Sequence, residues 1–380
     1  MSSENKVLIQ KQIFNAREKL AFFLRSVTKD KGLNVKLTQK SECSDYARCF
    51  YVFAANTIQR LDLVDIDGVA ERVFEVAVSH YENEQTNTSG KPFLQLLCFS
   101  LSVLNILDKE YLKRLLSVVS DLQVDDLDTH LCRMGVHEGV AGSGNLAMFQ
   151  AVLLASGNSS KETSYALDKW FSFHAAHLNE RGFWSKAIRP YLEFQNGYHQ
   201  YEIYQWAGYD LGDDLIRSKS ILACMDNKGH FAPYPGGGGC YDYDATFMLC
   251  FSKLNFNIKE VALNRLLTTL LNEQNNDGGF GESVYNNFNF NGLFRRISHV
   301  LSAREVGVFF ERAKYFIFLL NPKHKTIKTH WTIYQRDWDE SDLWDSWFRM
   351  LTIQKSSIFL GYTDADEWGC QTFPGVGYTN

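Results

Sequence analysis

Apolar residues recur at helical spacing along most of the chain, and stretches that alternate as a strand does are scarce. Ser44, followed by the stretch DYARCFYVFAANTIQRL, is typical of an amphipathic helix that begins at a capping serine. Apolar positions three and four residues apart predict further helices. These lie at about 8–26, 66–84, 92–107, 109–121, 144–156, 162–179, 212–225, 241–254, 257–273, 300–320 and 340–354. The sequence therefore predicts an all-α protein.

Three turns between the predicted helices combine glycine with an aromatic residue. They are Arg181-Gly182-Phe183-Trp184, Lys228-Gly229-His230-Phe231 and Asp277-Gly278-Gly279-Phe280-Gly281. The first two lie roughly 47 residues apart and the third about 50 residues further on, an interval that predicts repeated hairpins of two helices. One hairpin cannot bury its apolar face alone, so copies stack side by side. We expect a single α/α-toroid domain over residues 1–380, with an open helical solenoid as the alternative.

Composition narrows the possible partners and compartments. The net charge of −5 comes without a basic stripe, which argues against a nucleic-acid partner. The eight cysteines include no CxxC pair, and the N-terminus lacks the apolar core of a signal peptide. No apolar run approaches the roughly 18–20 residues of a membrane span. We therefore expect a cytoplasmic protein with reduced cysteines, whose 14% aromatic residues build a bulky core, an aromatic-walled pocket, or both.

Residues 274–283, QNNDGGFGES, resemble the repeat loop of squalene cyclases and of protein prenyltransferase β subunits. A glutamine near a helix end can hydrogen-bond to neighbouring backbone, and glycines allow a tight turn at positive φ. The loop has a structural role in that superfamily. The resemblance therefore supports the α/α toroid and says little about chemistry.

Residues 236–249, GGGGCYDYDATFML, resemble the segment of class II terpene cyclases that carries the DxDD motif, and the repeat loop follows at similar spacing. In that family the middle aspartate protonates an alkene or an epoxide. The resemblance assigns this role to Asp244, with Asp242 as its carboxylate neighbour. Two carboxylates held close together resist double ionisation, so one keeps a proton. Ala245 replaces the last aspartate of the motif, which favours a less demanding proton transfer.

The leading hypothesis is a proton-initiated cyclisation or isomerisation of an isoprenoid or related small molecule in a central aromatic cavity. In it Asp244 donates the proton, Asp242 tunes it, and aromatic faces stabilise the developing cation. The residues expected around the substrate are Tyr201, Glu202, Tyr241, Tyr243, Phe231, Trp184, Asn196 and Arg349. An alternative is that both aspartates interact only with the first turn of their helix.

No cofactor and no metal are expected. The cysteine after the glycine run, Cys240, resembles a zinc ligand of prenyltransferase β subunits, but Gly238 stands where their ligand aspartate would be. The helix around residues 343–348 also lacks the histidine ligand, whereas a catalytic zinc needs about three protein ligands.

The densest polar–aromatic cluster is the stretch EFQNGYHQYE, which contains Asn196, Tyr198, His199, Tyr201 and Glu202. If this stretch is helical, Tyr198, Tyr201 and Glu202 share one face. A second hypothesis is therefore a toroid polysaccharide lyase or epimerase that uses His199 as base and a tyrosine as acid. A third is a ligand-binding toroid without catalysis.

Overall fold

The computed structural model describes residues 3–84, 90–119, 126–156, 161–209, 214–285, 290–320, 326–328 and 333–378. Helices dominate, so the all-α class is confirmed. The α-helices are α1 (Ser3–Ser26), α2 (Asp45–Thr57), α3 (Ile66–Glu84), α4 (Lys91–Leu107), α5 (Lys109–Val119), α6 (Leu127–Arg133), α7 (Ser143–Ser156), α8 (Lys161–Ala176), α9 (Pro190–Trp206), α10 (Leu215–Ala223), α11 (Gly239–Phe251), α12 (Phe256–Glu273), α13 (Phe290–Leu301), α14 (Val306–Leu319) and α15 (Leu343–Phe359). Short 3-10 helices lie at Leu61–Leu63, Val136–Glu138 and Ala365–Glu367. Strands β1 (Thr326–Lys328) and β2 (Ile333–Gln335) form an antiparallel hairpin in which Thr326 faces Gln335.

Internal contacts divide the chain into two compact units. Unit 1 comprises Met1–Val64, Arg189–Tyr191 and Asp214–Gly369, and unit 2 comprises Asp65–Ile188, Leu192–Asp213 and Cys370–Asn380. The single domain and the closure of the hairpins into a ring remain predictions.

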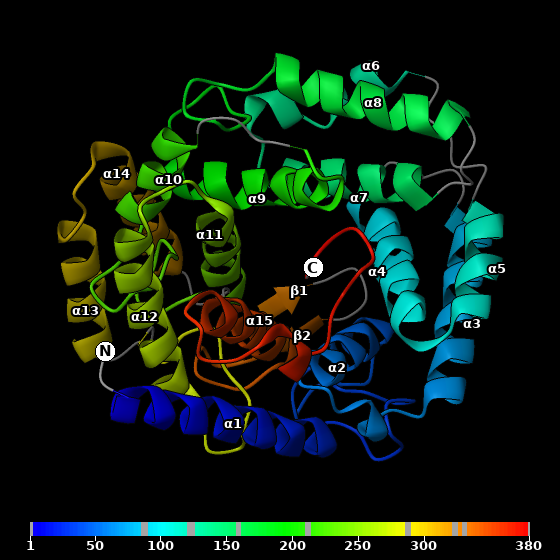
Figure 1. Cartoon of the computed structure of the whole chain (residues 1–380), viewed down its shortest axis with the longest axis horizontal. Coiled ribbons are helices and arrows are strands. Elements are labelled where there is room, and N and C mark those ends of the chain that lie inside the picture. The colour runs from blue at the N-terminus through cyan, green and yellow to red at the C-terminus, as the bar shows by residue number, and fades with distance from the viewer. Residues whose placement is uncertain are drawn as a thin grey trace. The chain divides into compact units, whose positions relative to one another are not determined.

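The core of unit 1 is built on α15, which packs along α11 on one side and α2 on another (Figure 1). The helix begins at Asp342, whose side chain accepts the Asp345 amide at 2.8 Å and so caps an otherwise unpaired donor. Trp347 is 2% exposed, and its ring lies 4.9 Å from the ring of Phe53 on α2. Aromatic packing of this kind buries a large apolar area and holds α15 in the middle of the unit.

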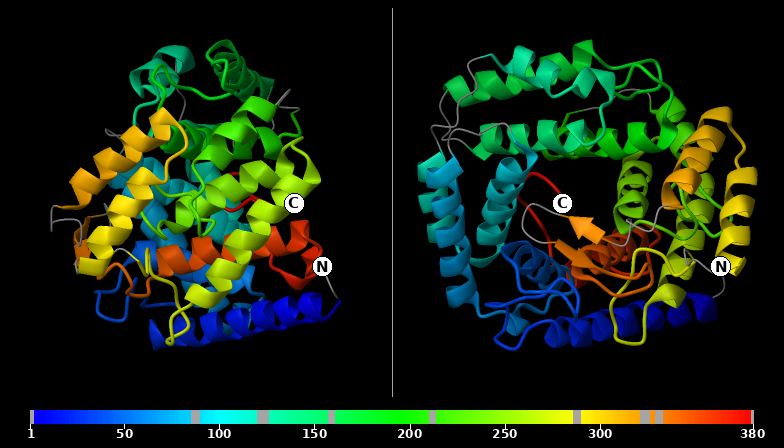
Figure 2. Two further views of the ribbon diagram at one scale, coloured as in Figure 1. Left: turned by 90° about the vertical axis from the view of Figure 1, so that its left-hand side faces the viewer. Right: turned by 180° about the vertical axis from the view of Figure 1, so that it is seen from behind.

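Two further helix pairs complete unit 1. Helix α12 packs on both α1 and α15, while α13 and α14 form a neighbouring pair, yellow to orange in both views of Figure 2. The Arg312 side chain on α14 is 1% exposed and donates to the His299 carbonyl on α13 at 2.8 Å. This bond satisfies a carbonyl near the C-terminal end of α13, where no further helical amide follows.

Unit 2 contains α3 to α8 and most of α9. Helix α4 packs against α3, α5 and α7, and its eleven buried positions explain why its sequence is apolar on nearly all sides. Trp170 on α8 is fully buried and donates its indole N–H to the Ala147 carbonyl of α7 at 3.0 Å.

The three glycine–aromatic turns singled out in the sequence share one backbone geometry. In each turn, the residue three positions before the first glycine donates its amide to the carbonyl four residues further along the chain. These bonds measure 2.9, 2.8 and 3.0 Å for Asn179, Asp226 and Asn275. Three residues after these, Gly182, Gly229 and Gly278 have φ of 78°, 103° and 91°, values that favour glycine. The glycines are 47 residues (182 to 229) and 49 residues (229 to 278) apart.

The predicted loop function of Gln274 is also confirmed, because its side-chain amide donates to the carbonyls of Ala16 and Gly278 at 2.9 and 2.8 Å. The single helix predicted over 300–320 is wrong. Helix α13 ends at Leu301 and α14 begins at Val306, with apolar residues at helical spacing on both sides of the break. Among the described helices, none is long and apolar enough to cross a membrane.

Candidate functional site

The glycine run before α11 is packed by tyrosine rings. A side chain at Gly236 would overlap the ring of Tyr285, and one at Gly237 would overlap the ring of Tyr234. Gly236 and Gly238 also have positive φ, at 62° and 70°. Only glycine permits both the backbone conformation and the close approach of the rings. The run therefore has a packing function, and it places the first turn of α11 inside the unit.

Asp242 on α11 is fully buried and accepts three hydrogen bonds. Its Oδ2 accepts from His230 Nδ1 at 2.8 Å and from Arg349 Nη1 at 2.9 Å, and its Oδ1 accepts from the Phe231 amide at 2.8 Å. Asp242 thus joins α11 to the second glycine–aromatic turn and to Arg349 on α15.

His230 extends this network toward α12. Its Nε2 lies 3.1 Å from Glu273 Oε2, and its side chain is completely buried. Burial opposes a charged imidazole, but the charges of Asp242 and Glu273 outweigh it and raise the pKa of His230 to about 10. Burial likewise opposes ionisation of Glu273, yet the His230 charge keeps the pKa of Glu273 below its ordinary value. His230 is therefore cationic at neutral pH.

Arg349 on α15 ties three segments together. In addition to its bond to Asp242, Arg349 donates from Nη2 to the carbonyls of Gly236 at 3.1 Å and Glu282 at 2.7 Å. The side chain is 2% exposed. A buried guanidinium needs its donors satisfied in this way. Arg349, expected near the substrate, instead binds protein groups of the glycine run, the repeat loop and α11.

A second charged cluster is centred on Arg336. Its guanidinium forms ion pairs with the carboxylates of Glu282, Asp342 and Asp345, the last at 2.6 Å. Asp342 and Asp345 are 0% and 1% exposed. Burial raises the pKa of Glu282, the Arg336 charge opposes this, and the Asp345 charge adds to it. Two buried carboxyls and the half-buried carboxyl of Glu282 thus share the Arg336 guanidinium.

Asp244 lies beside this carboxyl-rich cluster. It is 2% exposed. Burial raises the pKa of the Cys240 thiol, and the negative charges of Asp244, Asp345 and Glu282 raise it further. The Cys240 thiol is therefore within electrostatic reach of three carboxyls, one of which is Asp244.

Several aromatic rings lie beside Glu282 of the Arg336 cluster. The Tyr234 hydroxyl donates to Glu282, and its ring lies 6.3, 5.9 and 5.6 Å from those of Tyr241, Tyr315 and Trp338. Tyr241, expected near the substrate, bonds through its hydroxyl to that of Tyr315 at 2.9 Å. Faces of such rings stabilise positive charge.

The two aspartates of the motif have different neighbours. Residues two apart on a helix lie on different sides of it. Asp242 contacts Arg349 and His230, whereas Asp244 lies near Cys240. Tyr243 between them is fully buried, with its ring 5.9 Å from that of Phe348. Phe231 is fully buried as well, and its amide rather than its ring reaches Asp242.

In unit 2, His199 on α9 has a very different environment. Its Nε2 accepts from Asn145 Nδ2 at 2.7 Å, since the Asn145 oxygen accepts from Lys91 at 3.3 Å. Burial, followed by the nearby Lys91 charge, lowers the pKa of His199 to about 3. The imidazole is therefore neutral and a weak base at neutral pH.

The other candidates of α9 make contacts within unit 2. As expected from their spacing, Tyr198 and Glu202 share a face, and the Tyr198 hydroxyl donates to Glu202 Oε1 at 2.7 Å. The same oxygen accepts the amides of Gly377 and Tyr378 at 2.9 and 3.0 Å. Tyr201 donates to the Gly182 carbonyl at 2.5 Å. This face of α9 thus holds the C-terminal segment and the first glycine–aromatic turn.

Two further candidates also bind backbone. Asn196 accepts the Gly144 amide at 3.3 Å and donates to the Val140 carbonyl at 3.0 Å. Trp184 donates its indole N–H to the His174 carbonyl at 2.7 Å.

Four charged residues of the unit 1 network were not among the site residues expected from the sequence, namely His230, Glu273, Glu282 and Arg336. Two of them, His230 and Glu282, lie in the second glycine–aromatic turn and directly after the third, respectively. A charged residue beside the glycine–aromatic pair was the signal that could have identified them. No protein-family model, curated protein or solved structure matches this chain.

Proposed function

We propose that the protein is a proton-transfer enzyme of the cyclase or isomerase kind, with Asp244 as the proton donor. The observation that carries the proposal is the group of buried and half-buried carboxyls near Cys240 and Arg336. Asp244, Glu282, Asp342 and Asp345 outnumber the guanidinium that pairs with three of them. An excess of buried carboxyls favours retention of a proton at neutral pH.

The function of Asp242 in this proposal differs from the one expected from sequence. Because Arg349 and His230 compensate its charge, Asp242 orients α11 and leaves the tuning of Asp244 to Asp345 and Glu282. The adjoining rings of Tyr234, Tyr241 and Trp338 fit a reaction in which an apolar substrate becomes cationic. The proposed substrate is an isoprenoid or a related small molecule. The eight free cysteines suit the reducing cytoplasm, where we place the protein.

The test is an incubation of purified protein with linear isoprenoids, free and diphosphorylated, followed by mass spectrometry. We expect a product of unchanged mass from wild type and none from Asp244→Asn. The matched control is Asp366→Asn, an exposed aspartate, which should turn over as wild type does. Thermal unfolding of both variants shows whether the fold is intact. Full turnover by Asp244→Asn would rule the proposal out.

The lyase or epimerase hypothesis is weaker, because a general base works best with a pKa near the operating pH and that of His199 is about 3. Turnover of a uronate polymer that is lost in His199→Ala would reinstate it. Binding of an isoprenoid without conversion would favour the non-catalytic alternative.

A further inference from the structure

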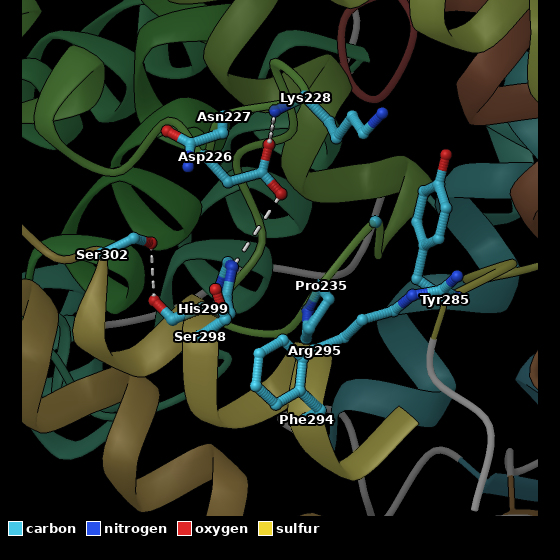
Figure 3. Close-up of a pocket in the computed structure, with 11 residues that line it drawn as sticks. Asp226, Asn227, Lys228, Pro235, Tyr285, Phe294, Arg295, Ser298, His299 and Ser302 are labelled. Carbon is cyan, nitrogen blue, oxygen red and sulfur yellow. Dashed lines mark hydrogen bonds and ion pairs between the residues drawn. The ribbon is translucent and has the colours of Figure 1, made fainter. Parts of the chain in front are cut away.

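A cavity of about 300 Å³ lies in unit 1, between the second glycine–aromatic turn and α13 (Figure 3). One wall is the turn itself, with Asp226, Asn227 and Lys228. The opposite wall is α13, and Tyr285 and Pro235 close a third side. The size is at the lower end of the range for small-molecule pockets.

The turn that forms the first wall is firmly held. Asp226 Oδ1 accepts the amides of Lys228, Gly229 and His230 at 2.8, 2.9 and 3.0 Å. Thr269 on α12 also donates to the Lys228 carbonyl at 2.7 Å. Asp226 Oδ1 is thus bonded to the turn, and its Oδ2 lies 3.9 Å from His299 Nδ1. The Lys228 side chain beside it is exposed.

The α13 wall supplies residues at helical spacing. Phe294, Arg295, Ser298 and His299 of α13, and Ser302 directly after it, line the cavity at intervals of three and four residues. The His299 ring is 7% exposed, and its Nε2 has no hydrogen-bond partner among the residues that the structure describes. A buried polar nitrogen of this kind at a cavity wall is a place where a ligand atom can bond.

The third side combines a flat ring with a positive charge. The Arg295 guanidinium lies 5.3 Å from the centre of the Tyr285 ring, which packs against Gly236. The Tyr285 hydroxyl donates to Glu273, so the ring orientation is fixed by the charged network. The lining therefore presents Arg295 and Lys228 against the single carboxylate of Asp226, together with the flat faces of Tyr285 and Phe294.

We propose that this cavity binds a small organic anion that carries a flat apolar group. Arg295 and Lys228 bind the anionic end, and Tyr285 and Phe294 contact the apolar end. Arginine suits carboxylate and phosphate because its planar fork matches their oxygens. The proposal does not depend on proton transfer by Asp244.

The experiment measures binding of four probes to the full chain by isothermal titration calorimetry: phenyl phosphate, benzoate, inorganic phosphate and benzyl alcohol. We expect phenyl phosphate and benzoate to bind. Inorganic phosphate lacks the aromatic ring and benzyl alcohol lacks the negative charge, so each should bind at least about tenfold more weakly. Benzyl alcohol binding as tightly as benzoate would overturn the assignment of the cations. Inorganic phosphate binding as tightly as phenyl phosphate would overturn the assignment of the aromatic faces. Binding of none of the four would overturn the site.

Variants locate the binding. Arg295→Gln should weaken phenyl phosphate about tenfold, as expected for one charge-assisted hydrogen bond. Its control is Arg304→Gln, an exposed arginine outside the cavity. Phe294→Ser should weaken the aromatic anions, whereas Phe310→Ser, equally exposed on α14, should leave them unchanged. Asp244→Asn should bind as wild type does, which separates this proposal from the catalytic one. If Arg295→Gln and Phe294→Ser weakened binding no more than their controls do, the assignment of this site would be wrong.

Discussion

Two buried histidines in the two units of the chain have opposite electrostatic states. His230 in unit 1 is 0% exposed with a pKa of about 10, and His199 in unit 2 is 7% exposed with a pKa of about 3. Burial lowers the pKa in both cases. The difference arises because His230 contacts Asp242 and Glu273, while His199 contacts the neutral amide of Asn145. Neighbouring charges, rather than depth, decide whether a buried histidine is charged.

The largest expected effect comes from breaking the charged network. Asp242→Asn removes the negative charge that compensates Arg349 and His230, and such a loss within a buried ion pair costs about 3–5 kcal/mol of unfolding free energy. Urea unfolding followed by circular dichroism measures this. Asp366→Asn, at an exposed site, should change stability by less than about 0.5 kcal/mol. A similar small loss for Asp242→Asn would show that its neighbours are not both charged.

The loss of stability at alkaline pH tests whether His230 is charged in the folded protein. Its folded pKa of about 10 lies above the ordinary value near 6.5, so the folded protein holds a proton that the unfolded chain releases. This contribution is complete below about pH 6.5 and is lost as the pH rises toward 10, at up to about 1.4 kcal/mol per pH unit. His230→Gln cannot titrate and should show a flatter slope between about pH 7 and 9. An unchanged slope would mean that His230 is neutral in the folded protein.

The loss of stability at acidic pH tests whether His199 is neutral in the folded protein, because its pKa is shifted in the opposite direction. Its folded pKa of about 3 lies below the ordinary value, so the unfolded chain binds a proton that the folded protein excludes. The contribution is complete above about pH 6.5 and is lost as the pH falls toward 3. His199→Gln should therefore lose less stability than wild type between about pH 6 and 4. Parallel curves for the two proteins would refute a neutral His199.

The smallest effect is expected at Glu202 in unit 2. Glu202→Gln keeps an oxygen that can accept from Tyr198, Gly377 and Tyr378, so we expect a loss of about 1 kcal/mol. The same urea titration gives the value. A loss as large as that of Asp242→Asn would remove the contrast between the two units.

The sequence predicts those parts of the fold that are specified locally. The three glycine–aromatic turns could be located because positive φ at Gly182, Gly229 and Gly278 is a local requirement. The network could not be, because it joins Asp242 to Arg349, 107 positions away, and His230 to Glu273, 43 positions away. The break between α13 and α14 was missed because apolar residues at helical spacing continue across it.

The glycine run before α11 has a thermodynamic consequence. A glycine loses more chain freedom on folding than other residues, by roughly 0.5–1 kcal/mol each relative to alanine. Four in succession, from Gly236 to Gly239, concentrate this entropy loss where the tyrosine rings and Arg349 hold the backbone. Because an entropic cost grows with temperature, this segment should be among the first parts of unit 1 to open on heating, and amide hydrogen exchange there should accelerate before the protein unfolds as a whole.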